Sequence, residues 1–147
     1  MPQASRSRVI AATPDELWRV VGDPSHLARW WPRVERVEGV RRGTFTEVMR
    51  TKKGRNVRAD FHVVEADRPR RHAWAQDLEG TPFERFLALH EVAAELEPVE
   101  DGATRVTLTS RQKLRGLSRF GGGGFMLKRA TRRQLDEALE ALEGLVG

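Results

Sequence analysis

Two short helices with strong end signals lie close together near the start of the chain, within residues 13–32. Thr13 is placed to cap the first helix, because Pro14 follows at the first helical position and Glu16 completes a capping box. Asp23, followed by another proline, is placed to cap the second helix in the same way. Three of the four tryptophans of the chain fall in this segment. Helices this short are not stable alone, so we expect them to pack against a larger structure.

The chain from residue 34 to residue 114, together with residues 5–12, has the pattern of β-strands. Apolar and polar residues alternate with period two, and short turns separate the segments. We expect strands at residues 5–12, 34–40, 44–51, 56–66, 71–78, 83–97 and 104–114. Connections this short favour an antiparallel meander, and one face of such a sheet has to be covered.

The element that we expect to cover this face of the sheet lies in the last part of the chain. Residues 125–146 repeat leucine and alanine at helical spacing, which indicates one long amphipathic helix. Its basic residues lie in the first half and its acidic residues in the second, which is the unfavourable order for the helix dipole. This order indicates that the basic half serves something other than helix stability.

The composition argues against several classes of protein. The chain has no run of the roughly 18 apolar residues that a transmembrane helix needs, and its N-terminus lacks the apolar segment of a signal peptide. Cysteine is absent and the four histidines have no metal-ligand spacing, so we expect no disulfide, no metal and no cofactor. We therefore expect a cytoplasmic protein.

The expected order of elements is a strand, two small helices, a meander of strands and a long final helix. This is the order of the helix-grip fold, in the α+β class, with a curved antiparallel sheet of about seven strands. Several motifs resemble those of one family: TPDELW at residues 13–18, DPSHLARWWP at 23–32, VVEADRP at 63–69 and DGATRV at 101–106. With these motifs the chain resembles the polyketide cyclase/dehydrase and lipid-transport superfamily (SRPBCC), which is also called START-like or Bet v 1-like.

The resemblance spans nearly the whole chain and implies a single START-like domain over residues 1–147. It implies that the sheet grips the long helix and that a cavity between them takes lipophilic or aromatic molecules. The motifs mark turns and packing positions of the scaffold, so they are specific for the fold and not for one function.

Strand alternation indicates which side chains would face such a cavity. His90 lies on the apolar face of strand 83–97 and is the histidine that most clearly points inward. An ordinary histidine pKa of about 6.5 suits proton transfer, which makes His90 the candidate catalytic residue. The set expected to bind a ligand is Phe61, Trp74, Gln76, Phe86, His90, Ser110 and Gln112. The alternative is that these polar groups bond only one another or water inside a core.

Arg50 joins this set under one condition. If Lys53 and Gly54 form a two-residue turn, Arg50 faces the same side of the sheet as Val57. The same register places Glu47 opposite Asp60, which is an unfavourable pair of charges.

Two classes of function compete. A binding or carrier protein needs only the cavity, and this is the first expectation. A cyclase or dehydratase would use His90 as acid and base, with Arg50 or Gln76 steadying an enolate oxygen. The chain has no tyrosine, a residue that cyclase relatives often use, and nothing in the sequence requires catalysis.

Two basic stretches leave a third class open. Residues 41–71 hold ten Lys or Arg against four acids, and residues 111–133 hold eight and no acid. They are either solvated strand faces or a surface that docks an anionic membrane or an acidic carrier protein, as an adaptor would. The net charge of +5 is too small to argue for nucleic acid, so we expect no nucleic-acid partner, and either a monomer or a homodimer.

Overall fold

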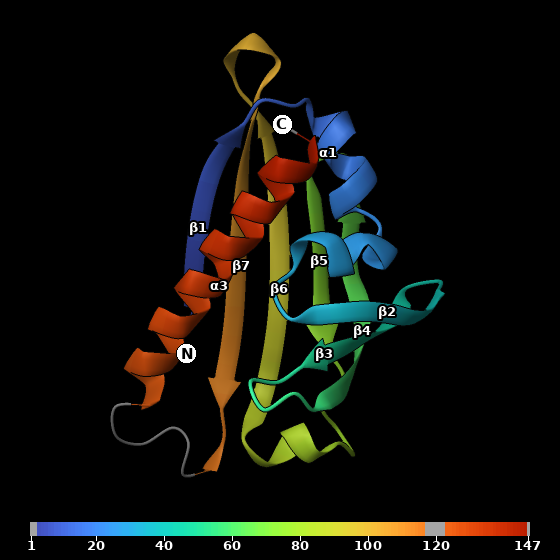
Figure 1. Cartoon of the computed structure of the whole chain (residues 1–147), viewed down its shortest axis with the longest axis vertical. Helices are drawn as coiled ribbons and strands as arrows, with labels where there is room; N and C mark the ends of the chain where they lie inside the picture. Colours follow the sequence, from blue (N-terminus) through green and yellow to red (C-terminus); the bar gives the residue numbers. More distant parts are fainter. Residues whose placement is uncertain (1–2, 117–122, 147) are drawn as a thin grey trace.

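The computed structural model describes residues 3–116 and 123–146, and Figure 1 shows how its elements are arranged. Within these residues seven antiparallel strands form one sheet. The strands are β1 (Gln3–Ile10), β2 (Val34–Arg41), β3 (Thr44–Arg50), β4 (Asn56–Asp67), β5 (Arg71–Gln76), β6 (Leu87–Pro98) and β7 (Thr104–Leu114). Their order is β1-β7-β6-β5-β4-β3-β2, which confirms the predicted meander.

Helices cover one face of this sheet, which we call the helix face. The α-helices are α1 (Pro14–Val21), α2 (Leu27–Trp30) and α3 (Gly123–Val146), and the short 3-10 helices are η1 (Pro24–His26), η2 (Pro82–Arg85) and η3 (Glu100–Gly102). Helix α3 runs diagonally across the sheet and contacts β1, β7 and α2 (Figure 1). The predicted α+β class and helix-grip arrangement are confirmed. Among the described residues, no helix is long and apolar enough to cross a membrane.

The end signals of the two short helices are used as predicted. The Glu16 backbone N–H donates to Thr13 Oγ1 at 3.2 Å, and the Thr13 hydroxyl donates to Glu16 Oε1 at 3.2 Å. Asp23 Oδ1 accepts from the Ser25 backbone N–H at 3.0 Å and from its hydroxyl at 2.7 Å. Thr13 thus caps α1, and Asp23 caps η1, which continues directly into α2 without a further side-chain cap.

The apolar core lies on the helix face and contains most of the large side chains. Trp30, Trp31 and Trp74 are all buried, with ring centroids 5.4 to 6.5 Å apart and nearly perpendicular planes. From α3, the buried side chains of Leu135, Leu139 and Leu142 join them, as do Val106 and Leu108 of β7. The prediction that the short helices pack against a larger structure is confirmed.

Two local predictions are wrong. The β3–β4 hairpin turns through three residues, Lys52 to Gly54, with Gly54 at φ +79°. Three-residue loops with a glycine in the left-handed region are a common hairpin type. The extra residue shifts the register by one, so that Thr46 lies opposite Asp60 and Glu47 lies opposite Ala59. In addition, the predicted strand 83–97 begins at Leu87, because η2 occupies its first residues.

Ion pairs with β1 explain why acidic residues lie in the second half of α3. Arg6 of β1 lies 3.3 Å from Asp136, and Arg8 lies 2.9 Å from Glu143. These two pairs join the edge strand to the helix that covers it. The acidic half of α3 therefore fastens the helix to β1.

Candidate functional site

A row of polar side chains crosses the helix face where the apolar core ends. Directly opposite residues of antiparallel strands face the same side of a sheet. Gln76 lies opposite Phe61, and His90 lies opposite Gln112. His90 Nδ1 and Gln76 Oε1 are 2.9 Å apart, which joins Gln76, His90 and Gln112 into one polar row, with Phe61 beside it. Strand alternation predicts that all four side chains lie on one face, and the register confirms that placement.

The protonation of this row follows from burial. Desolvation lowers the pKa of His90 to about 4, so the imidazole is neutral at pH 7. Since an amide oxygen can only accept, His90 Nδ1 carries the hydrogen and Nε2 keeps its lone pair. Gln76 is 8% exposed, and its Nε2 has no hydrogen-bond partner among the described residues. The pair thus offers one acceptor and one buried donor.

Glu47 is a functional candidate that the sequence analysis missed. It lies on β3 between Phe45 and Met49, on the helix face, opposite Ala59 and Val37. The residue is 2% exposed, and no described group makes a hydrogen bond or ion pair with its carboxyl. Burial raises the pKa of Glu47 to about 8, so the group is mostly neutral at pH 7. Its alternation with apolar neighbours was the available signal, and the wrong hairpin register hid it.

His72 is a second buried titratable group that the sequence analysis overlooked. It alternates with Trp74 and Gln76 on β5, and it is 2% exposed, so His90 is not the only inward histidine. Its ring lies 5.7 Å from that of Trp18 and 5.2 Å from that of Trp74. Desolvation lowers the pKa of His72. These contacts place His72 within the aromatic core.

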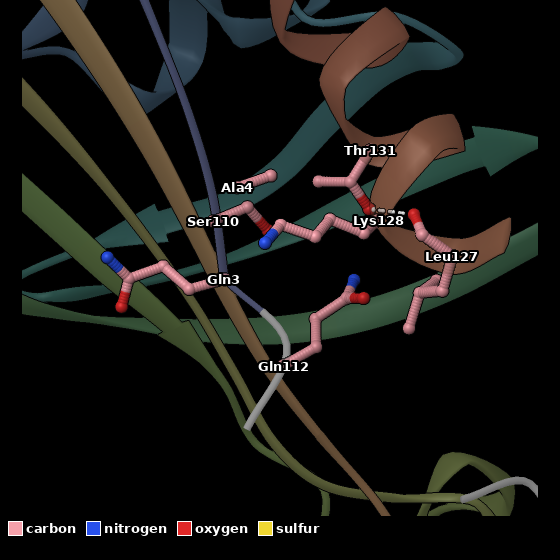
Figure 2. A pocket seen from close by; sticks show the side chains of 7 residues that line it. All are labelled: Gln3, Ala4, Ser110, Gln112, Leu127, Lys128 and Thr131. Carbon is pink, nitrogen blue, oxygen red and sulfur yellow. Dashed lines mark hydrogen bonds between the residues drawn. The ribbon is translucent and has the colours of Figure 1, made fainter. Parts of the chain in front are cut away.

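Ser110 and Gln112 of β7 face the first half of α3. Figure 2 shows them around a small pocket with Lys128, whose side chain extends toward Ser110. The Thr131 hydroxyl donates to the Leu127 carbonyl oxygen at 2.8 Å, so its own donor is already used. The pocket is lined by Gln3, Ala4, Ser110, Gln112, Leu127, Lys128 and Thr131. The two predicted residues therefore lie between sheet and helix, as expected.

A larger open cleft of about 360 Å³ adjoins this pocket and shares Gln112 with it. Its lining comes from α3, from β7, from the α2–β2 connection and from the β3–β4 loop: Pro32, Arg33, Lys52, Gln112, Leu127, Ala130, Thr131, Arg133, Gln134 and Glu137. The cleft is large enough for a small organic ligand. Gln112 connects it to the polar row.

Comparison with known families identifies the scaffold. The family described as polyketide cyclase / dehydrase and lipid transport matches the chain over residues 1–147. The chain belongs to this family. No protein among those with curated descriptions matches it by sequence.

Several solved structures share the fold of this chain. A START superfamily protein from Mycobacterium smegmatis is 15% identical with a TM-score of 0.78, and 98% of this chain and 96% of that chain are covered. The protein TTHA0849 from Thermus thermophilus is 25% identical with a TM-score of 0.73, covering 97% and 95%. The di-domain ARO/CYC BexL from the BE-7585A biosynthetic pathway is 23% identical with a TM-score of 0.77, covering 98% and 46%.

Two of the predicted ligand-binding residues lie elsewhere in this member of the family. Arg50 lies opposite Asn56, and its neighbour Met49 lies opposite Val57, so Arg50 is on the other face of the sheet. Its side chain is 63% exposed and 3.7 Å from Glu35. The wrong hairpin register caused this error.

Phe86 was expected on the apolar face of a strand, but it lies between η2 and β6. It is 46% exposed, with its ring centroid 6.0 Å from that of Phe83. Proline at the start of η2 and the bend that follows remove it from the strand alternation on which the prediction rested.

Phe61 and Trp74 lie on the helix face as predicted, and both are buried in the core. The Phe61 ring stacks on Phe45 at 5.5 Å and lies 6.0 Å from the His90 ring. Trp74 contacts the rings of Trp30 and Trp31. Phe61 therefore adjoins the polar row directly, while Trp74 lies one step further into the aromatic core.

Proposed function

We propose that this family member binds a small lipophilic or aromatic molecule between the helix face of the sheet and α3. The observation that carries the proposal is the row formed by Gln76, His90 and Gln112 at the edge of an apolar core. A mostly apolar site with a few orienting polar groups is typical of small-molecule binding. The family description, which names polyketide cyclases and lipid transport, supports the same class of ligand.

The side chains near the polar row also indicate the charge of the ligand group that would lie beside them. His90 and Glu47 are both mostly neutral at pH 7, since burial shifts their pKa values in opposite directions. A charged group beside them would lose its hydration without gaining a counter-ion. The inner end of the ligand is therefore uncharged: a hydroxyl group can donate to His90 Nε2, and a hydroxyl or carbonyl oxygen can accept from Gln76 Nε2.

The test uses N-phenyl-1-naphthylamine, an uncharged aromatic probe whose fluorescence rises in apolar surroundings. We expect saturable binding to the wild-type protein. Gln112→Trp fills the space between β7 and α3 and weakens probe binding at least about tenfold. Lys113→Trp is the matched control, because the next residue on the strand faces the opposite side and is exposed. Absence of saturable binding, or equal loss in both variants, contradicts the proposal.

A catalytic version of this function is favoured by one observation. His90 Nδ1 donates a hydrogen bond to Gln76 Oε1, so Nε2 is free to take a proton from a carbon acid. The Gln76 amide N–H can then donate to the enolate oxygen that forms. Hydrogen–deuterium exchange at the central carbon of a 1,3-diketone, followed by NMR, measures this step. If the protein is an enzyme of this kind, His90→Gln keeps diketone binding and loses the exchange. If wild type does not accelerate exchange, the protein is a binder only.

A further inference from the structure

The open cleft beside the polar row carries an excess of positive charge that the proposed function does not explain. Arg33, Lys52 and Arg133 all line it, and Glu137 is the one acid among its lining residues. The three cations come from three separate parts of the chain. None of them makes an ion pair or a side-chain hydrogen bond with any described residue.

A second cleft of the same molecule shows that this excess is not a consequence of an arginine-rich composition. That cleft has a volume of about 370 Å³ and is also lined by three arginines, Arg70, Arg71 and Arg105. Each of these is paired: with Asp67 at 2.8 Å, with Glu65 and Glu95 at 2.7 and 3.2 Å, and with Glu97 at 3.7 Å. Two clefts of nearly equal volume thus differ in whether their cations have partners.

One of the unpaired cations, Arg33, has an unusual backbone conformation. Arg33 has φ +67°, a left-handed conformation that is uncommon for residues other than glycine, and its carbonyl accepts from the Arg50 N–H at 2.9 Å. Lys52 lies in the three-residue loop that closes the β3–β4 hairpin. Strained backbone of this kind is found preferentially at binding sites.

Apart from the three cations and Glu137, the lining is apolar or uncharged, which indicates the kind of molecule that would lie there. Leu127 and Ala130 of α3 and Pro32 line the same cleft, and Gln112 leads from it to the polar row. Arg133 lies near the middle of α3, away from both helix ends, so the helix dipole does not account for its charge.

We infer that the cleft binds the anionic head of an amphiphilic ligand whose apolar body extends past Gln112 toward the polar row. This inference rests on the proposed function and adds the chemical class of the ligand: a single-chain molecule with a phosphate or carboxylate at one end. The head is held by Arg33, Lys52 and Arg133, and the neutral groups at the inner end exclude a second charge.

The experiment compares decyl phosphate with 1-decanol, which share one chain and differ in the head. Each displaces N-phenyl-1-naphthylamine from the wild-type protein, and we expect decyl phosphate to bind at least about tenfold more tightly at low salt. The preference shrinks in 0.5 M NaCl, because salt screens exposed charges. The triple variant Arg33→Gln, Lys52→Gln, Arg133→Gln loses the preference and keeps decanol binding unchanged.

The second cleft supplies the matched control. Arg70→Gln, Arg71→Gln, Arg105→Gln removes the same number of charges, and we expect it to keep the preference for decyl phosphate. Equal loss in both triple variants overturns the inference, because net charge alone then explains binding. So does equal wild-type affinity for decyl phosphate and decanol, which leaves the proposed function intact. If neither amphiphile nor the probe binds, the proposed function fails as well.

Two further measurements distinguish a soluble amphiphile from free phosphate and from a membrane surface as the source of the anionic group. Inorganic phosphate at 10 mM displaces little decyl phosphate if the apolar body contributes to binding, and complete displacement would reduce the cleft to a simple ion site. Phosphatidylglycerol vesicles test membrane docking. If the unpaired cations are needed for vesicle binding but not for binding of soluble decyl phosphate, the cleft is a membrane-docking surface and the inference is wrong.

Discussion

The helix face of the sheet has an apolar half and a polar half, built from the same strands. The apolar half contains Trp74 of β5 and Val92 of β6, covered by Trp30 and the leucines of α3. One alternation step further along these strands, the polar half begins with Gln76 and His90. In the apolar half the side chains contact one another. Buried polar atoms without a hydrogen-bond partner among the described residues occur in both halves: Trp30 Nε1 and His72 Nδ1 in the apolar half, and Gln76 Nε2 in the polar half. The Glu47 carboxyl, also in the polar half, is 2% exposed, and desolvation alone raises its pKa.

This difference indicates which half of the helix face stabilises the fold and which half contains residues that stability does not explain. An unpartnered buried polar group destabilises a folded chain, and apolar side chains in these positions would make a more stable core. Departures from the rules that favour folding are expected at functional sites. Trp30 and His72 pack large rings into the aromatic core, whereas Gln76 and Glu47 add little apolar surface. The apolar half therefore holds the domain together, and the polar half is the part whose residues need a function to explain them.

The largest effect is expected in the apolar half. Trp30 is 2% exposed and contacts two other indole rings, so Trp30→Ala should lower the free energy of unfolding by about 3–5 kcal/mol. Urea denaturation measures it. Gln76→Ala is the comparison in the polar half, and it should cost much less. Equal costs would mean that the two halves are equally structural, and the distinction between them would fail.

A smaller effect, with a characteristic pH dependence, is expected from Glu47. Burial raises its pKa from 4.5 to about 8 in the folded chain. Between these values the folded chain holds a proton that the unfolded chain releases, so the free energy of unfolding falls as the pH rises. We expect a loss of about 2 kcal/mol from pH 6 to pH 8 by urea denaturation.

Glu47→Gln tests this origin, because the amide keeps the shape of the protonated acid and does not titrate. The variant should lack the loss of stability between pH 6 and pH 8, and it should be more stable than wild type at pH 8. If both proteins show the same pH profile in this range, Glu47 is ionised in the folded chain and the polar half is more hydrated than its burial indicates.

Local patterns predicted most of the fold. The helix caps at Thr13 and Asp23, the strand alternation and the amphipathic period of the last helix all depend on residues near one another in sequence. The same alternation placed Gln76 and His90 on one face, because a strand fixes the side of each residue relative to its neighbours.

The errors came from features that local patterns do not determine. Two-residue and three-residue turns both fit the glycine at position 54, and a difference of one residue reverses the face of every side chain on β3. Arg50 was therefore placed inside and Glu47 was missed. The basic cleft joins residues from three distant segments, so no single stretch of sequence indicates it.

The smallest effect concerns His90, and it opposes that of Glu47. Burial lowers the pKa of His90 from 6.5 to about 4, so between these values the unfolded chain binds more protons than the folded chain. The stabilising contribution is complete above pH 6.5 and is lost as the pH falls toward 4. We expect a loss of about 1–2 kcal/mol, since the side chain keeps part of its contact with solvent.

The two titrations overlap between about pH 4.5 and 6.5, where their slopes have opposite signs and partly cancel. The effect of His90 is therefore best measured in a Glu47→Gln background, where the acid-side loss should stand alone. Adding His90→Phe to that background should remove the loss, because phenylalanine fills a similar volume and does not titrate. If the acid-side loss persists in the double variant, it arises from another group, and His72, whose pKa burial also lowers, is the next histidine to replace.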